Sequence, residues 1–215
     1  MLINLSAAFD TVDHEILLRR LDTSYGITGN AHKWFQSYLF NRKQFVRLGL
    51  SKSSIIHLLC GIPQGSVRGS LLFVLYMADL IHLIEQLGLQ AHMYADDTQV
   101  LGLCLPRDVI MLQSRLSACL DDVALWMRSN RLQLNTNKTE LLWCTTARRQ
   151  SQLPCTSLRV GSTMVSPTSS VRYLDFYIDA DSSGRTQIIK TIASCCDNFA
   201  ECVDRCLYQR TSSSL

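Results

Sequence analysis

Long uninterrupted apolar runs are lacking in this sequence of 215 residues. The apolar stretch from Leu71 to Ala78 is followed by Asp79 and His82, and it falls short of the roughly 20 residues that a membrane-spanning helix needs. It therefore predicts a buried helix. The first ten residues also lack the basic start and cleavage site of a secretory signal. We expect an intracellular protein with no membrane segment, and the sequence does not decide between nucleus and cytoplasm.

C-x-x-C pairs are absent, although the chain has nine cysteines, an odd number. Without a secretory signal, this pattern predicts no disulfide framework and mostly free, buried thiols. The spacing of the last four cysteines fits no common zinc site, and no histidine follows His92. We expect no zinc at that late group, which comprises Cys195, Cys196, Cys202 and Cys206.

A strong excess of either charge is also missing. The chain has 21 Lys and Arg residues against 18 Asp and Glu, which gives a net charge of +3 and a pI near 8.4. A hydrophobic content of 47% is ordinary for one globular domain. The weak positive charge is compatible with a nucleic-acid partner but does not require one.

Helix and strand signals alternate along the chain and predict an α+β fold. Asp13 favours the N-cap of a first helix, and Pro106 suits the first turn of a later one. Further helices are expected at residues 29–40 and 66–85 and from 181 onward. Strands are expected at residues 1–6, 45–50, 54–59, 90–94, 98–103, 140–144, 158–160 and 171–178, with a turn at 51–53.

Two adjacent carboxylates, Asp96 and Asp97, lie between two of the expected strands. Their charges would repel each other and lose solvation in a hairpin unless a cation lay beside them. Polymerases use carboxylates to hold two divalent metals for phosphoryl transfer. The alternative is an exposed turn with two solvated aspartates, which is the commoner situation for an isolated pair of this kind.

The pair is accompanied by ordered motifs. The chain contains, in order, LSAAFDTVDH at residues 5–14, GIPQGS at 61–66 and YADD at 94–97. These strings resemble the A, B and C motifs of the reverse transcriptases of non-LTR (LINE-like) retrotransposons. NRLQLNTNKTE at 130–140 resembles the D motif of that family, and VRYLD at 171–175 resembles its E motif. An unrelated structural protein would need every ordered match to be a coincidence.

The resemblance implies the palm of a right-hand, reverse transcriptase-like polymerase. It also implies an RNA template, a DNA primer, deoxynucleotides and two Mg²⁺ ions. By the same resemblance Asp96 and Asp97 are metal ligands and catalytic residues. Lys138 is expected to approach the nucleotide phosphates and to protonate the leaving pyrophosphate. The alternative for Lys138 is a solvated surface lysine.

Further residues are expected to bind nucleotide or template. Phe9 resembles the steric gate that excludes a 2′-hydroxyl, although a phenylalanine there can equally be a core residue. The loop with Pro63, Gln64 and Gly65 is expected to support the template and nucleotide. Basic residues next to Phe45 either contact the template backbone or solvate a strand; these are Arg42, Lys43 and Arg47.

The sequence departs from the family pattern at several positions. The family has an aspartate five residues before the gate, where this chain has Asn4, so the third metal ligand is an amide. Asp10 and Asp13 are poor substitutes. The family usually has leucine, proline and glycine at the positions of Arg68, Ser70 and Asp175, where charge or polarity is expected to disturb a packed region.

These departures predict an impaired or inactive enzyme. The chain begins at the A motif, so we expect the fingers to be mostly missing. We assign residues 1–179 to the palm and 180–215 to a degenerate, thumb-like tail. The alternative is a non-catalytic relic of a retroelement with at most weak nucleic-acid binding.

Overall fold

The computed structural model describes residues 1–161 and 163–196, which form two compact units. Met1–Glu140 and Thr156–Ser166 make up the first unit. The second unit comprises Leu141–Cys155 and, within the described chain, residues 167–196. The palm and tail assignment at 179/180 stays a prediction, and residues 197–215 of that tail lie outside the described residues.

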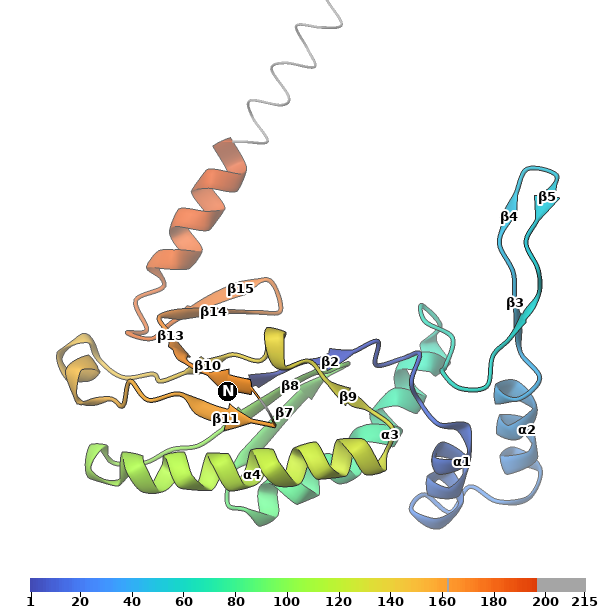
Figure 1. The fold of residues 1–215 in the computed structure, drawn as a ribbon, viewed down its shortest axis with the longest axis horizontal. Helices are drawn as coiled ribbons and strands as arrows, with labels where there is room; N and C mark the ends of the chain where they lie inside the picture. The colour runs from blue at the N-terminus through green and yellow to red at the C-terminus, as the bar shows by residue number, and fades with distance from the viewer. Residues whose placement is uncertain (162, 197–215) are drawn as a thin grey trace, which may run out of the picture. The chain divides into compact units, whose positions relative to one another are not determined.

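The first unit is built on a small antiparallel sheet in which the first strand pairs with the later hairpin (Figure 1). Strands β7 (Gln90–Tyr94) and β8 (Asp97–Leu101) form the hairpin, and β1 (Leu2–Ile3) pairs with β8. The expected hairpin is confirmed. The expected strand at residues 1–6 is divided, because β2 (Leu5–Ser6) pairs instead with β9 (Gln133–Leu134).

Helices α1 (His14–Thr23) and α2 (Gly29–Leu39) form where the sequence predicts them. Asp13 caps α1, with Oδ1 accepting from the amides of Glu15 and Ile16 at 3.0 Å. The helix expected from Pro106 begins as a 3₁₀ turn, η1 (Pro106–Asp108), and continues as α4 (Val109–Ser129). One apolar face of α4 is buried, and β11 (Leu158–Val160), which pairs with β12 (Thr163–Val165), packs against this helix.

Helix α3 (Val67–Gln86) begins after its N-cap Ser66 and packs against α1, α4 and β7. Within the described chain it is the one helix long and apolar enough to cross a membrane, judged by length and composition alone. The helix is longer than the apolar run Leu71–Ala78 on which the expectation of a buried helix rested. One such helix is weak evidence, because core helices pass the same test, and one side of α3 is buried through residues such as Leu72, Phe73 and Tyr76.

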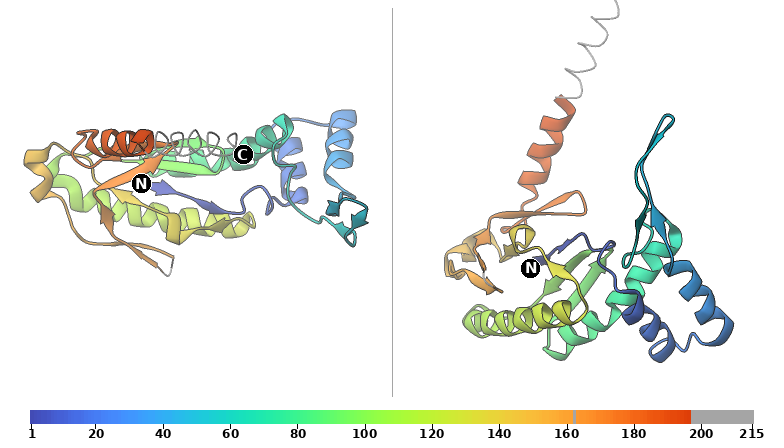
Figure 2. Two further views of the ribbon diagram at one scale, coloured as in Figure 1. Left: turned by 90° about the horizontal axis from the view of Figure 1, so that it is seen from above. Right: turned by 45° about the vertical axis from the view of Figure 1, so that its right-hand side comes forward.

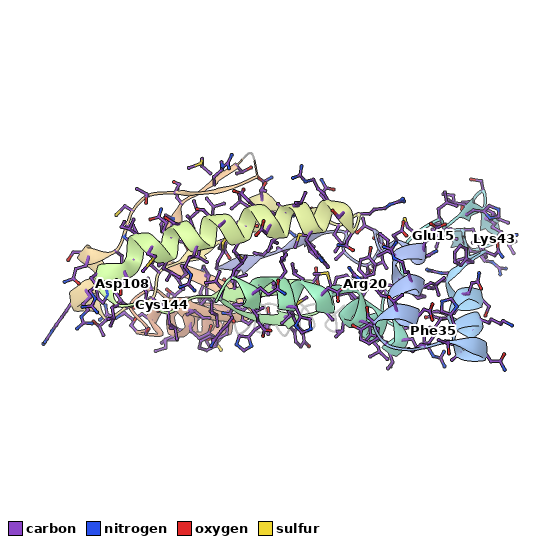
Figure 3. The ribbon with its side chains drawn as sticks, turned by 90° about the horizontal axis from the view of Figure 1, so that it is seen from below. Glu15, Arg20, Phe35, Lys43, Asp108 and Cys144 are labelled. Atoms are coloured by element: carbon purple, nitrogen blue, oxygen red, sulfur yellow. The ribbon has the colours of Figure 1, made fainter. Side chains whose placement is uncertain are left out.

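A buried arginine joins three of these helices. Arg20 of α1 pairs with Asp79 of α3 (Nε to Oδ2, 3.0 Å) and donates to the carbonyl of Tyr76 and, at 2.6 Å, to Oδ1 of Asn130. Its side chain is labelled in Figure 3. The guanidinium also lies over the rings of Tyr76 and Trp126. These partners compensate for the solvation that the buried charge loses, and they link the three helices.

A long hairpin, here called the arm, spans residues 43–57 (Figures 1 and 2). Strand β3 (Lys43–Gln44) pairs with β6 (Ile56–His57), and β4 (Arg47–Leu48) pairs with β5 (Ser51–Lys52). The expected turn at 51–53 was misplaced: the tip is at Gly49 and Leu50, since Gly49 supplies the positive φ of 57° that the turn needs.

The second unit contains a parallel pair, β10 (Leu141–Leu142) with β13 (Pro167–Thr168), and the 3₁₀ helix η3 (Ala147–Gln152). The single strand expected at 171–178 was wrong. Residues there form a hairpin of β14 (Ser170–Tyr173) and β15 (Phe176–Asp179), because Leu174 and Asp175 have φ of 47° and 65° and reverse the chain. Residues 185–196 are helical, as expected.

Two further expectations are corrected. Of the seven described cysteines all are free, but only Cys119 is buried; Cys202 and Cys206 lie outside the described residues. Arg68 and Ser70 are exposed, and so is Asp175, whose side chain is 88% accessible. These departures from the family pattern therefore do not place charge in a packed region.

Candidate active site

The two adjacent carboxylates lie at the tip of the β7/β8 hairpin. Tyr94 and Asp97 face each other in register, so Ala95 and Asp96 form a two-residue turn. Ala95 has a φ of 52°, which this tight reversal requires at its first central position. Both carboxylates are half-buried. The local alternation of strand residues and the short turn are sufficient to place them there.

Asn4 lies directly beside Asp97. The chain changes partner at this residue, with β1 paired to β8 on one side of it and β2 paired to β9 on the other. The Asn4 carbonyl accepts from the amide of Asn135 at 2.9 Å. Its side-chain Nδ2 donates to Oδ1 of Asp97 at 2.8 Å. The structure thus brings together two residues that are 93 positions apart.

Burial and neighbouring charges alter the pKa of Asp97. Burial raises the pKa of the Asp97 carboxyl, and the negative charge of Asp96 raises it further. The hydrogen bond from Asn4 and the positive charge of Lys138 oppose this rise in pKa but do not cancel it. An amide donor and one lysine therefore compensate only part of the charge that two adjacent carboxylates create.

Lys138 ends the 3₁₀ helix η2 (Thr136–Lys138), which follows β9. Asn135 fixes this turn, with its Oδ1 accepting from the backbone amide of Lys138 at 3.2 Å. The side chain is exposed. Asn4 directly precedes β2, and the turn with Lys138 follows β9. The pairing of β2 with β9 therefore positions both residues.

Phe9 packs against a core ring. It is half-buried and stacks on Phe73 of α3, with ring centroids 4.7 Å apart and planes inclined by 21°. This position serves the packing of α3 and leaves part of the ring accessible. The structure therefore gives Phe9 the packing contact of a core residue, and its role as a gate stays a prediction.

The loop starting at Gly61 is tied to the turn that follows Phe9. The Gly61 amide donates to the Val12 carbonyl at 2.8 Å, and the Ile62 amide donates to the Phe9 carbonyl at 2.9 Å. Gly61 has a φ of 84°, and a Cβ there would lie 2.9 Å from the Asp10 carbonyl oxygen. Only glycine fits at this approach without displacing backbone.

The rest of the loop leads into α3. Ser66 Oγ donates to the Pro63 carbonyl and accepts from the Gly69 amide, both at 2.9 Å. Gln64 and Gly65 are exposed. Pro63, Gln64 and Gly65 therefore form a fixed, solvent-facing loop, and no described contact tests their predicted role.

Arg42 and Lys43 differ in what they contact. Arg42 Nη1 donates to the Gly61 carbonyl at 2.7 Å, and Nε2 of buried His14 lies 2.7 Å from the same oxygen. Sequence reasoning missed both contacts; the position of His14 beside the capping residue Asp13 was the only available signal. Lys43 is exposed and shares with Arg42 the wall of a groove of about 720 Å³.

The residues at the hairpin tip do not match a two-metal site. No cluster of three His, Cys, Asp or Glu side chains that could hold a metal occurs within residues 1–161 and 163–196. Asp96 and Asp97 supply two carboxylates, and the neighbouring third group, Asn4, turns an N–H donor toward Asp97. A neutral amide offers a divalent cation less than a carboxylate does.

The chain is similar to known proteins over most of its length. "RNA-directed DNA polymerase from mobile element jockey" of Drosophila funebris is 26% identical over 193 residues, which cover 86% of this chain and 20% of the relative. The protein of the same description from Drosophila melanogaster is 26% identical over 182 residues, covering 82% and 19%. "Probable RNA-directed DNA polymerase from transposon BS" of Drosophila melanogaster is 28% identical over 190 residues, also covering 82% and 19%.

This chain thus spans about a fifth of the length of these relatives. The relatives confirm the resemblance to the reverse transcriptases of LINE-like elements. Residues 1–178 match the family described as reverse transcriptase (RNA-dependent DNA polymerase). The chain therefore belongs to the reverse transcriptase family.

Proposed function

We propose that this chain is an RNA-directed DNA polymerase domain derived from a non-LTR retrotransposon, with its catalysis impaired by Asn4. The observation that carries the proposal is the hydrogen bond from Asn4 Nδ2 to Asp97 Oδ1 at 2.8 Å. The side chain that hydrogen-bonds to Asp97 is an amide, where the family resemblance requires an aspartate. The partners are an RNA template, a DNA primer and deoxynucleotides, and the location is intracellular.

The remaining roles follow the motif positions. Asp96 and Asp97 are the catalytic carboxylates, and Lys138 donates a proton or a positive charge to the phosphates. Phe9 restricts the sugar of the incoming nucleotide. Lys43, together with the Pro63, Gln64 and Gly65 loop, contacts the template, while Arg42 supports that loop through the Gly61 carbonyl.

Mg²⁺ binding is weakened in this proposal. Asp96 and Asp97 are the residues that would hold a divalent ion, and such an ion would supply stabilisation of the charge that develops on the phosphoryl oxygens. The Asn4 amide contributes no negative charge. Losing about 4 kcal/mol of transition-state stabilisation corresponds to a rate roughly 10³-fold lower.

A second candidate function is a non-catalytic relic that retains weak nucleic-acid binding. The mismatch between the donor set and a two-metal site favours it, because binding through exposed cations such as Lys43 needs no metal.

Primer extension on an RNA template, with Mg²⁺ or Mn²⁺, tests the proposal. We expect the unmodified chain to extend no more than Asp96→Ala does, and Asn4→Asp to extend measurably more. Asn30→Asp, on the exposed start of α2, is the matched control for an added carboxylate away from the site. Extension by the unmodified chain equal to that of Asn4→Asp would contradict the impairment. No extension by folded Asn4→Asp would favour the relic.

A further inference from the structure

Acidic residues are absent from one continuous part of the chain. Residues 23–78 contain no Asp or Glu, yet they contain six of the 21 Lys and Arg residues, which leaves 15 basic against 18 acidic residues elsewhere. The net charge of +3 is therefore unevenly distributed, because residues 23–78 are basic and the rest of the chain has a slight acidic excess. The basic segment includes α2, the arm and the start of α3, all within the first unit. Here the set of its exposed side chains is called the acid-free surface.

Arg68 is held in place on this surface by an aromatic ring. Its guanidinium carbon lies 5.0 Å from the centroid of the Trp34 ring, and the indole is itself 44% exposed. Tyr38 stacks on Trp34 with centroids 5.4 Å apart and planes inclined by 11°. In the part of the chain that the structure describes, Arg68 forms no ion pair with a carboxylate. A guanidinium held by a ring and not by a carboxylate keeps its N–H groups available for an anion.

Lys52, on the arm, is a second cation that lies over an exposed aromatic ring. Lys52 Nζ lies 3.8 Å from the centroid of Phe45, and this ring is 45% exposed. Lys33, Lys43 and Arg47 are exposed as well. Arg42 is the exception, because it donates to the Gly61 carbonyl and serves the fold. Exposed cations interleaved with exposed aromatic rings are the combination that binds single-stranded nucleic acids.

We propose that the acid-free surface binds a single strand of nucleic acid, with Arg68, held over Trp34, as a phosphate contact. The family resemblance expects leucine at position 68, so this contact belongs to this chain and not to the family pattern. The proposal rests on the proposed function only for the class of ligand. It requires neither a metal nor catalysis.

Charge selects this ligand over a protein partner. The arm exposes apolar residues that a protein could cover, among them Leu48 and Leu50. The segment 23–78 has several cations and no carboxylate of its own, although Asp10 lines the groove that Arg42 and Lys43 share. A polyanion can pair the cations of this segment, because it supplies one phosphate per nucleotide. The stacked rings add contacts to bases that do not depend on sequence.

Fluorescence anisotropy with a labelled oligouridine of roughly 20 nucleotides tests the proposal on the full chain. We expect Arg68→Leu to weaken binding by about threefold to tenfold at low salt. The magnitude of the slope of log affinity against log salt concentration should fall by about 0.7, as for one lost phosphate contact. Trp34→Ala should weaken binding with a smaller change in slope, because the charge of Arg68 remains.

Arg128→Leu is the matched control, since Arg128 is exposed on α4 and lies outside the acid-free surface. It should bind about as the unmodified chain does. The proposal is overturned if Arg68→Leu binds as tightly as the unmodified chain, if Arg128→Leu loses as much, or if the folded chain does not bind oligouridine at micromolar concentration. Equal or tighter binding of duplex DNA would exclude the stacking contribution.

Arg68→Gln replaces Arg68→Leu if circular dichroism shows that the leucine variant does not fold. Failure of the proposed function is distinguishable from failure of this inference. The first appears as absent primer extension by Asn4→Asp, and the second appears as affinity that does not depend on Arg68.

Discussion

At the scale of single residues, Asn4 decides which group lies beside the carboxylate pair. As an amide it donates to Asp97 at 2.8 Å and adds no charge beside Asp96. An aspartate at this position would remove the hydrogen-bond donor and add a third negative charge. This charge would be unfavourable, because burial and the charge of Asp96 already raise the pKa of Asp97. A cation would then be needed to stabilise the folded state.

We therefore expect Asn4→Asp to lower the free energy of unfolding by about 1–2 kcal/mol in the presence of a chelator. Mg²⁺ should recover most of this loss, because it binds the folded state of the variant preferentially. Thermal denaturation with a chelator and with Mg²⁺ measures both effects. The Tm of the unmodified chain should change little between the two conditions, and an equal rise in both proteins would count against the charge argument.

Asp175, an exposed departure from the family pattern, is accommodated by its local conformation. Asp175 occupies a turn position with a φ of 65°, which explains why a glycine is expected there. Aspartate tolerates this left-handed conformation better than most residues do, and Arg172 pairs with it at 2.5 Å. The substitution is thus accommodated at a hairpin turn.

At the scale of elements, the contact between Gly61 and the turn after Phe9 holds two motifs together. Gly61 and Gly65 both have positive φ, of 84° and 79°. They differ in space, because a Cβ on Gly61 would lie 2.9 Å from the Asp10 carbonyl oxygen, whereas nothing lies within 4 Å of one on Gly65. Substituting each glycine therefore distinguishes the effect of backbone strain, present at both positions, from that of a steric clash, present only at Gly61.

We expect Gly65→Ala to destabilise the chain by about 1 kcal/mol through backbone strain alone. Gly61→Ala should cost at least about 2 kcal/mol more, since backbone atoms must move to admit the methyl group. Urea denaturation of the two variants under the same conditions gives the difference. Equal losses would mean that the two motifs are not held in the close contact described.

At the scale of the whole molecule, the first unit is discontinuous in sequence. Its last part, Thr156–Ser166, contributes β11, which packs against α4. Leu158 and Val160 of this strand are 1% and 0% exposed. Without them one buried face of α4 would be open to water.

We expect a chain of residues 1–166 to unfold cooperatively and a chain of residues 1–140 to lose cooperativity or aggregate. Uncovering two core side chains costs about 3–5 kcal/mol, a large share of the stability of a small domain. Circular dichroism during heating, with size-exclusion chromatography of both chains, measures this difference. A cooperative transition at the same temperature in both chains would show that β11 is dispensable.

The sequence alone determined those features that depend on neighbouring residues. Asp13 and Ser66 mark helix starts because a cap acts within three residues, and the β7/β8 hairpin follows from a two-residue turn between short strands. The order of the motifs predicted the family. The β14/β15 hairpin was missed, because the positive φ of Leu174 and Asp175 leaves no strong local signal in non-glycine residues. The arm turn was misplaced although Gly49 marks it.

Only the tertiary structure decided which distant residues meet. Asn4 lies beside Asp97 because the chain changes sheet partner at that residue, from β8 to β9. The indole beneath Arg68 and the carbonyl that Arg42 contacts depend in the same way on the packing of α2 and α3 and on the path of the loop at Gly61. Pairing of strands and packing of helices join residues through space, so composition and local periodicity do not reveal them.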